Sequence, residues 1–250
     1  MNDFNKIFNQ IAYRHDFMKV FDDFLTLTIC ALSMGRMETL YLDTIKEYSK
    51  EEISLFGNLL GALIIEYEKR ASIEGAWYEG LGDFFMENTS KFGQDARGQF
   101  FTPDTICNFM AMVTAGEDGL SERQIIDPAC GSGRMLIAFD RMNVKNRFEN
   151  FYVACDIDNR CVKMCAINMF LYGLKGVVIH MDSLSQKIWM GYRVFLADSG
   201  IGIIPLDKHE CIPYLYKSRT DKEKSEEFQL TQEIKISEHK NEKAIQLTLF

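Results

Sequence analysis

The segment that most constrains this chain is Asp127–Gly133, which reads Asp-Pro-Ala-Cys-Gly-Ser-Gly and lies between two patterned apolar stretches. Residues 123–126 are typical of a short strand, and residues 134–142 show the spacing of an apolar helix. Glycines allow a tight turn and a close approach of the backbone to a ligand. The free N–H groups at the start of a helix favour an anionic or polar group. The segment therefore predicts a ligand-binding turn, and a plain strand-to-helix turn is the alternative.

The residues around this turn alternate between strand and helix patterns. This order predicts an α/β domain with parallel strands and right-handed crossovers. The predicted strands cover residues 123–127, 150–156, 176–182 and 192–198, and the predicted helices cover residues 103–113, 132–142 and 159–172.

Residues 1–97 form a different region, in which apolar residues recur every three or four positions. Phe4, Ile7, Phe8 and Ile11 illustrate this spacing, which indicates amphipathic helices packed as a bundle. The α/β region follows over residues 98–216. Residues 217–250 crowd charges together and are expected to form a mobile tail or a lone solvated helix.

The charge balance limits what the chain binds without help. Its net charge is −8, whereas neutralising DNA phosphates requires clustered lysine and arginine. A strong nonspecific grip on DNA by this chain alone is therefore not expected.

Cysteine usage and hydropathy give two further expectations. Cys161 and Cys165 share one face of a predicted helix without a histidine nearby, so a core role is expected rather than a metal site. The chain starts without a signal-peptide pattern, and the apolar run Phe24–Met34 is too short to cross a bilayer. We therefore expect a soluble cytoplasmic protein that does not bind membranes.

Three segments together carry a family resemblance. They are Gly98–Pro103 (Gly-Gln-Phe-Phe-Thr-Pro), the turn Asp127–Gly133, and Phe151–Asp158 (Phe-Tyr-Val-Ala-Cys-Asp-Ile-Asp). With them the chain resembles the N6-adenine DNA methyltransferases, in particular the modification subunit of type I restriction-modification systems. The resemblance implies a truncated Rossmann-like, S-adenosylmethionine-dependent methyltransferase domain after a helical bundle. It also implies DNA as a partner, with sequence recognition supplied by another subunit of a restriction-modification system or mobile element.

The resemblance also implies roles for individual residues. Asp127 would face the methionine amino group, Asp156 would accept both ribose hydroxyls, and Asp182 would take the adenine amino group. Asp158 is the alternative to Asp156, but it better fits the N-cap of the next helix. The expected cofactor-binding set is Phe101, Thr102, Asp127, Ala129, Gly131, Gly133, Asp156, Ile157, Asp182 and Ser183.

One segment departs from the family pattern. Family members follow the fourth strand with Asn-Pro-Pro-Tyr or a near variant, whose side chains hold the flipped adenine. Here the matching residues are Asp198, Ser199, Gly200 and Ile201. Asp198 is the candidate catalytic acceptor, but the prolines and the aromatic ring are replaced. We therefore expect little or no methyl transfer by this chain alone.

The last five residues suggest a different partner. Gln246-Leu-Thr-Leu-Phe250 resembles the peptide that docks on bacterial sliding clamps, with Gln246, Leu247, Leu249 and Phe250 as the contact residues. The rival function is a non-enzymatic accessory protein that reaches the clamp through this peptide. Alternatively, these residues fold back onto the domain as a terminal strand.

Overall fold

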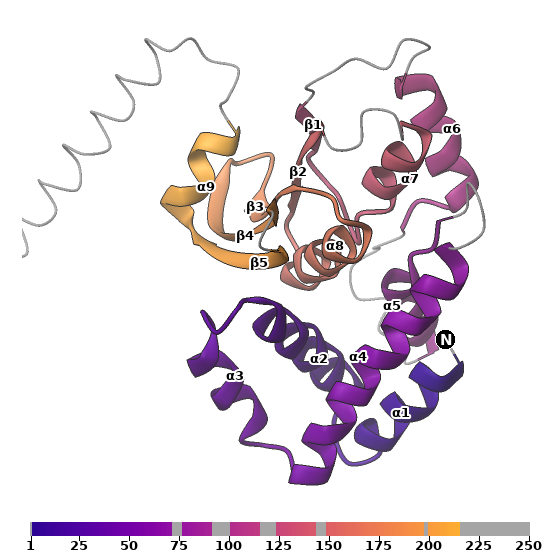
Figure 1. Cartoon of the computed structure of the whole chain (residues 1–250), viewed down its shortest axis with the longest axis vertical. Helices are drawn as coiled ribbons and strands as arrows, with labels where there is room; N and C mark the ends of the chain where they lie inside the picture. The colour runs from indigo at the N-terminus through magenta and orange to yellow at the C-terminus, as the bar shows by residue number, and fades with distance from the viewer. Residues whose placement is uncertain are drawn as a thin grey trace, which may run out of the picture. The chain divides into compact units, whose positions relative to one another are not determined.

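The computed structural model describes residues 2–71, 77–91, 101–115, 124–143, 149–197 and 200–215. Residues Met1–Cys211 form one compact unit, and Ile212–Phe250 form a second, of which only the end of one helix is described. Helices precede the sheet along the chain (Figure 1). They are α1 (Asn2–Ala12), α2 (Phe17–Leu32), α3 (Glu38–Ile45), α4 (Lys50–Ala71), α5 (Gly80–Lys91) and α6 (Asp104–Ala115).

The sheet has the strand order β1-β2-β3-β4-β5. Its strands are β1 (Gln124–Asp127), β2 (Phe151–Asp156), β3 (Gly176–Asp182), β4 (Lys187–Ala197) and β5 (Gly200–Asp207). The first three strands pair in parallel, and helices α7 (Arg134–Met142) and α8 (Asn159–Tyr172) connect them. The predicted Rossmann-like α/β domain behind an N-terminal helical bundle is confirmed.

Burial explains why β2 and β3 read as nearly continuous apolar runs. Tyr152 and Ala154 of β2 pack into the main hydrophobic core, and Val153 and Cys155, which point to the other face, are buried as well. Strands covered on both faces are typical of parallel sheets. Next along the chain, Asp158 caps α8 as predicted, because its side chain accepts a hydrogen bond from the Arg160 amide.

The fourth strand differs from the sequence-based expectation. Strand β4 begins at Lys187, follows β3 after a short turn, and pairs antiparallel to it, so that Val194 lies opposite Gly176. It continues into β5 as an antiparallel hairpin, and helix α9 (Lys208–Leu215) follows. The end of β4 therefore lies beside the amino end of β3. The segment predicted to match the fourth strand of the family does not reach the carboxyl edge of the parallel strands.

An aromatic cluster holds the N-terminal helices together. Phe84 of α5 lies 5.0 and 4.8 Å, between ring centroids, from Phe4 and Phe8 of α1. It lies 5.6 Å from Phe21 of α2. All four rings are buried, so the apolar spacing in the sequence corresponds to one shared core.

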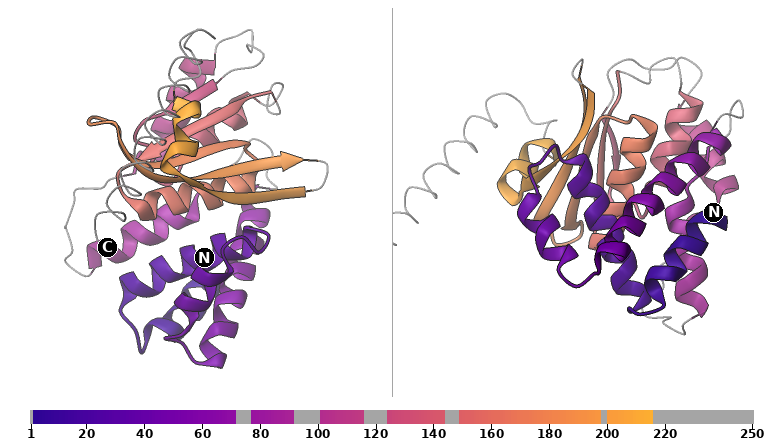
Figure 2. Two further views of the ribbon diagram at one scale, coloured as in Figure 1. Left: turned by 90° about the vertical axis from the view of Figure 1, so that its left-hand side faces the viewer. Right: turned by 60° about the horizontal axis from the view of Figure 1, so that its bottom comes forward.

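Helix α8 joins these helices to the sheet, and Figure 2 shows it between the two. The join includes a buried cation, because the Lys163 side chain is only 7% exposed. Its Nζ donates to Asp22 Oδ1 at 2.8 Å and to Thr26 Oγ1 at 2.9 Å, both on α2. A buried lysine of this kind depends on its partners for its charge to be tolerated.

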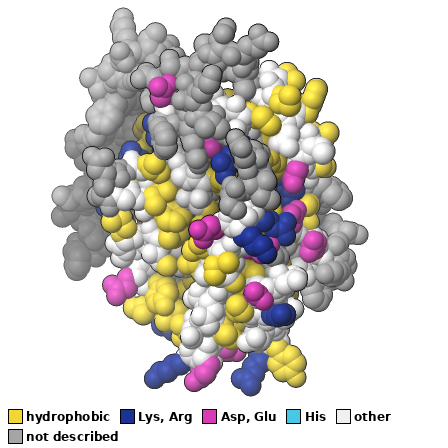
Figure 3. All heavy atoms as spheres, turned by 45° about the vertical axis from the view of Figure 1, so that its right-hand side comes forward, with side chains coloured by type: hydrophobic (Ala, Val, Ile, Leu, Met, Phe, Trp, Pro, Cys, Tyr) yellow, Lys and Arg dark blue, Asp and Glu magenta, His cyan; other side chains and the backbone are white. Residues whose placement is uncertain are grey.

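Hydrophobic side chains also reach the surface, as Figure 3 shows for one face. Helix α6 buries Cys107 and Ala111 but exposes a row of larger apolar residues. These are Ile106, Phe109, Met110, Met112 and Val113. None of the described helices combines the length and the hydropathy that a membrane-spanning segment requires.

Candidate functional site

The three parallel strands each end in an aspartate. Asp127, Asp156 and Asp182 are the last residues of β1, β2 and β3, as the sequence predicted. Parallel strands present their carboxyl ends at one edge of the sheet, where ligands bind in open α/β folds. This edge is therefore the place to look for a site.

The glycine turn after β1 lies against the end of β2. The Gly131 amide donates to Asp156 Oδ2 at 2.8 Å, and the Cys130 amide donates to the Cys155 carbonyl at 2.8 Å. Gly131 has φ +54°, and a Cβ atom there would lie 2.8 Å from Cδ1 of Phe101. The backbone conformation favours a glycine here, and the ring packed over it leaves no room for a Cβ atom.

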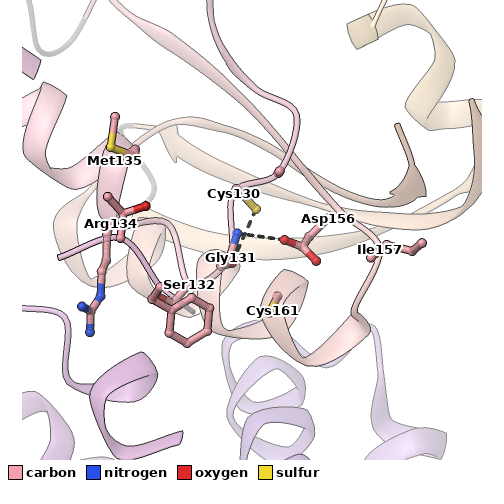
Figure 4. A pocket seen from close by; sticks show the side chains of 11 residues that line it. Cys130, Gly131, Ser132, Arg134, Met135, Asp156, Ile157 and Cys161 are labelled. Atoms are coloured by element: carbon pink, nitrogen blue, oxygen red, sulfur yellow. Dashed lines mark hydrogen bonds between the residues drawn. The ribbon is translucent and has the colours of Figure 1, made fainter. Parts of the chain in front are cut away.

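A cavity of about 250 Å³ opens between this turn, Asp156 and the segment before α6. In Figure 4, Arg134 extends away from the Gly131–Asp156 pair on one side, and Ile157 extends away on the other. The lining residues are Phe101, Thr102, Ala129, Cys130, Gly131, Ser132, Arg134, Met135, Asp156, Ile157 and Cys161. This volume lies just below the range of about 300–1,000 Å³ that is typical of small-molecule sites.

The lining includes much of the cofactor-binding set expected from the sequence. Phe101, Thr102, Ala129, Gly131, Asp156 and Ile157 all belong to it. Asp127, Gly133, Asp182 and Ser183 lie at the same strand ends and turns but are not among the lining residues. Their individual roles stay predictions.

Asp156 is held in place by backbone amides. Its Oδ2 accepts from Gly131 N at 2.8 Å, and its Oδ1 accepts from Asp158 N at 2.8 Å. An ionised carboxylate offers about four lone-pair sites, so each oxygen keeps capacity for a further donor. The side chain is therefore a rigid acceptor directed at the cavity.

The pKa of Asp127 is raised above its ordinary value. Burial raises its pKa, the hydrogen bond from the Ala129 amide at 3.1 Å opposes that shift, and the nearby charge of Asp156 adds to it. Two carboxylates in a partly desolvated site disfavour each other's ionisation. A positively charged ligand group would relieve this repulsion.

Asp182 is engaged by its own turn. Its carboxylate accepts from the amides of Leu184 and Ser185 at 2.9 and 3.2 Å and from the Ser185 hydroxyl at 2.7 Å. These hydrogen bonds, that of the Ser185 hydroxyl first, lower its pKa. Ser183 instead donates to the Pro128 carbonyl at 2.6 Å and so ties this turn to the glycine turn.

The pKa values of two cavity thiols, Cys130 and Cys161, are raised above the ordinary cysteine value. The neighbouring Cys165 thiol and burial raise the pKa of Cys130 well above its ordinary value. Burial likewise raises the pKa of Cys161. Cys161 and Cys165 are buried in the core, as expected, and the described residues contain no group of three or more His, Cys, Asp or Glu placed to hold a metal ion.

Arg134 is the cation of the cavity wall, and its side chain is only 7% exposed. Three carboxylates surround it: Glu79 at 3.0 Å from Nε, Asp104 at 3.5 Å from Nη1, and Asp83 in contact with Nη2. Burial alone would lower the pKa of Arg134, but Glu79 and Asp83 raise it above the ordinary value. Carboxylates thus outnumber the cation around the site.

Sequence reasoning missed several of these residues. Arg134 and Glu79 lie inside patterns that indicate only helix, and neither belongs to a recognised motif. An arginine directly after Gly133, at the start of an otherwise apolar helical pattern, was a usable signal because a buried cation needs an acidic partner. Which acid it pairs with, in a segment more than fifty residues earlier in the chain, is not visible in the sequence.

Two sequence-based assignments fall outside the described residues. Gln246, Leu247, Leu249 and Phe250, the expected clamp peptide, belong to that part of the chain, and their role stays a prediction. Asp198 lies there too, and its neighbours Ala197 and Gly200 pair with each other, beyond Val194, the β4 residue that lies opposite Gly176 of β3. The role of Asp198 as the acceptor stays a prediction.

The fold and the turn together define a Rossmann-like α/β domain whose glycine turn and acidic strand ends form the site. The family model described as N-6 DNA methylase matches residues 71–204, just over half of the chain. The chain belongs to this family.

Solved structures with a similar arrangement include two type I restriction-modification proteins. The methyltransferase subunit from Streptococcus thermophilus is 17% identical, with a TM-score of 0.41, over 74% of this chain and 40% of that one. A protein described as a modification subunit of a type I restriction enzyme from Vibrio vulnificus is 20% identical, with a TM-score of 0.29, over 58% and 27%. The chain therefore spans well under half of either subunit.

A third similar structure comes from Listeria monocytogenes and is described as a class I S-adenosylmethionine-dependent methyltransferase. It is 13% identical, with a TM-score of 0.40, over 78% of this chain and 67% of that one.

Proposed function

We propose that this chain binds S-adenosylmethionine at the glycine turn, as the cofactor-binding part of an N6-adenine DNA methylase. The observation that carries the proposal is the Gly131–Asp156 pair. A carboxylate fixed at the end of β2 borders a cavity whose other wall includes Gly131, where a side chain would collide with the Phe101 ring. This geometry suits a ligand with a diol at one end and a compact polar group at the other.

The residues present fit this ligand. Asp156 keeps free lone pairs for two ribose hydroxyls, and the exposed Ile157 beside it offers an apolar contact for a base. Asp127 and Asp156 would stabilise the positive sulfonium and ammonium groups, since the two carboxylates repel each other without them. When bound, the cofactor supplies an electrophilic methyl group.

The acceptor and the partners follow from the family and are part of the same proposal. We propose that adenine in DNA is the methyl acceptor of the complete system, and that other subunits supply DNA recognition. The net charge of −8 supports this division of roles, because a chain so acidic gains little from phosphate contacts alone.

Calorimetric titration of the purified chain with S-adenosylmethionine tests the proposal. Asp156→Ala should weaken binding by about 1–3 kcal/mol, or roughly 5- to 150-fold, the cost of losing hydrogen bonds to a charged acceptor. Asp158→Ala is the matched control, because it removes a neighbouring carboxylate that caps α8 outside the cavity lining. It should cost about 1 kcal/mol of stability and leave the affinity unchanged.

Two outcomes would contradict the proposal. The wild-type chain could give neither heat nor a thermal shift at high ligand concentration. Alternatively, Asp156→Ala and Asp158→Ala could lower the affinity equally, which would place the ligand away from Asp156.

A further inference from the structure

A single buried carboxylate connects the N-terminal helices to the glycine turn. The Glu79 side chain precedes α5 and has no exposed surface. Its Oε2 accepts from Ser132 Oγ at 2.7 Å and from Arg134 Nε at 3.0 Å. Its Oε1 accepts from Gly82 N at 2.7 Å and from Asn168 Nδ2 at 3.0 Å. The carboxylate thus fills all of its acceptor sites with protein donors.

The hydrogen bonds continue beyond Glu79 and fix the turn from a second side. Asn168 of α8 also donates to the Ser132 carbonyl at 2.7 Å. Its Oδ1 in turn accepts from the Tyr67 hydroxyl of α4 at 2.7 Å, and that hydroxyl accepts from the Gly80 amide at 2.9 Å. Elements far apart in the sequence therefore meet around one residue of the glycine turn.

Packing around Gly82 shows how closely α5 approaches the turn. A Cβ atom at Gly82 would lie 2.7 Å from Ser132 Oγ and 2.9 Å from Cδ2 of Phe101, and it would also collide with Glu79. Phe101 is the same ring that covers Gly131. A shift of α5 must therefore disturb both the turn and the ring that closes over it.

We propose that Glu79 is a positioning residue that holds the Gly131–Gly133 turn in its ligand-ready conformation. Glu79 does not line the cavity, so it acts through Ser132 and Arg134, which do. The inference rests on the proposed function for its consequence in binding, but the ordering of the turn is a property of the chain itself. If Glu79 has this role, the glycine turn adopts its ligand-ready conformation only when α5 packs against it.

Glu79→Gln is the variant that isolates this role. Glutamine keeps the size of the side chain but replaces one acceptor oxygen by an NH₂ group, which then faces N–H donors such as Arg134 Nε or Gly82 N. The matched control is Asp22→Asn, which likewise neutralises a carboxylate that pairs with a buried cation, Lys163, and that anchors an N-terminal helix to α8. The hydrogen bonds described for Asp22 involve Thr26 and Lys163, not the glycine turn.

Hydrogen exchange of the ligand-free protein, followed by mass spectrometry, tests the proposal directly. In Glu79→Gln, the amides of residues 129–135 should exchange about tenfold faster or more than in the wild type, relative to the change over residues 4–11. In Asp22→Asn, the turn should keep its protection while α2 and α8 lose theirs. The proposal would be overturned if the turn kept its full protection in Glu79→Gln. It would also be overturned if α1 lost as much protection as the turn, or if Asp22→Asn lowered the protection of the turn equally.

Calorimetry with S-adenosylmethionine adds a second readout. Glu79→Gln should raise the dissociation constant about tenfold, and Ser132→Ala combined with it should cost less than the two single effects together, because both act through one hydrogen bond. If the losses of binding free energy in the two single variants added up in the double variant, Glu79 and Ser132 would act independently, and the proposal would be contradicted. If the wild-type chain binds no S-adenosylmethionine, the proposed function fails, and the exchange experiment still decides the role of Glu79.

Discussion

At the scale of single residues, folding shifts the pKa values of two aspartates at the strand ends in opposite directions. Burial raises the pKa of Asp127, whereas hydrogen bonds within its turn lower the pKa of the exposed Asp182. An acid whose pKa is raised by folding contributes its full stabilisation below its unfolded pKa, and that contribution is lost as the pH rises through the folded pKa. An acid with a lowered pKa has the opposite dependence.

Asp127→Asn should therefore stabilise the ligand-free chain at neutral pH. Asparagine can still accept from the Ala129 amide but carries no charge that burial and Asp156 oppose. The gain in melting temperature should shrink as the pH falls toward the ordinary aspartate value of 3.8. On the proposed binding mode, the same substitution should weaken S-adenosylmethionine binding, because it removes a negative charge that would stabilise the cationic ligand.

Asp182→Asn is the control for net charge, since it also removes one negative charge from a chain of net charge −8. Its stability effect at neutral pH should have the opposite sign, because the fold favours the ionised form of Asp182. Thermal denaturation as a function of pH distinguishes the two. A stabilisation of equal size in both variants would show that general charge, rather than the site, is responsible.

At the scale of elements, the glycine turn is shaped by what packs on it. Phe101 covers Gly131 on one side, and Glu79, from the segment before α5, bonds Ser132 and Arg134 on the other. The turn thus depends on segments that precede it by about thirty to fifty residues in the chain. The sequence pattern predicts the turn itself but not these supports.

Gly131→Ala should lower the free energy of unfolding by more than the backbone strain alone. A residue other than glycine at positive φ costs about 1–2 kcal/mol. Gly35→Ala measures that term alone, since Gly35 has φ +80° and nothing within 4 Å of an added Cβ. Gly131→Ala must also displace the Phe101 ring, which adds about 1–3 kcal/mol of overpacking.

Chemical denaturation and calorimetry of both variants check this prediction. Gly35→Ala should lose stability and keep its affinity for S-adenosylmethionine, whereas Gly131→Ala should lose both. Equal losses of stability, with affinity retained in both, would mean that the Phe101 ring does not close over the turn in solution.

At the scale of the whole chain, the periodic apolar patterns predicted the limits of the strands and helices. They did not predict the direction of β4, which depends on one turn. Strands β1 to β3 are short apolar runs that end in aspartate, and helices α7 and α8 carry clear start or stop signals, so their limits agree with expectation within one or two residues. Hydrophobic patterning and capping are local properties, which is why they can be read from sequence.

The direction of β4 is not a local property. It follows from the turn after β3, in which Asp182 bonds its own backbone neighbours and Gln186 adopts φ +58°. A glutamine at positive φ gives no sequence signal, unlike the glycine or asparagine that usually marks a hairpin. The sequence therefore predicts a strand over residues 192–198 but not its antiparallel direction.

The antiparallel direction of β4 leads to the last prediction, that this chain alone binds the cofactor without methylating DNA. The neighbours of Asp198 pair with each other beyond Val194, which lies opposite Gly176 at the start of β3. Because β3 has seven residues, these neighbours lie roughly 20 Å or more from the edge that carries Asp156. An acceptor for the adenine amino group must lie within hydrogen-bond reach of the reacting nitrogen. Tritiated S-adenosylmethionine with adenine-containing duplex DNA should therefore give no incorporation above background, while calorimetry on the same preparation shows binding. Steady incorporation that Asp198→Ala abolishes would instead place Asp198 at the site and refute the hairpin as the active arrangement.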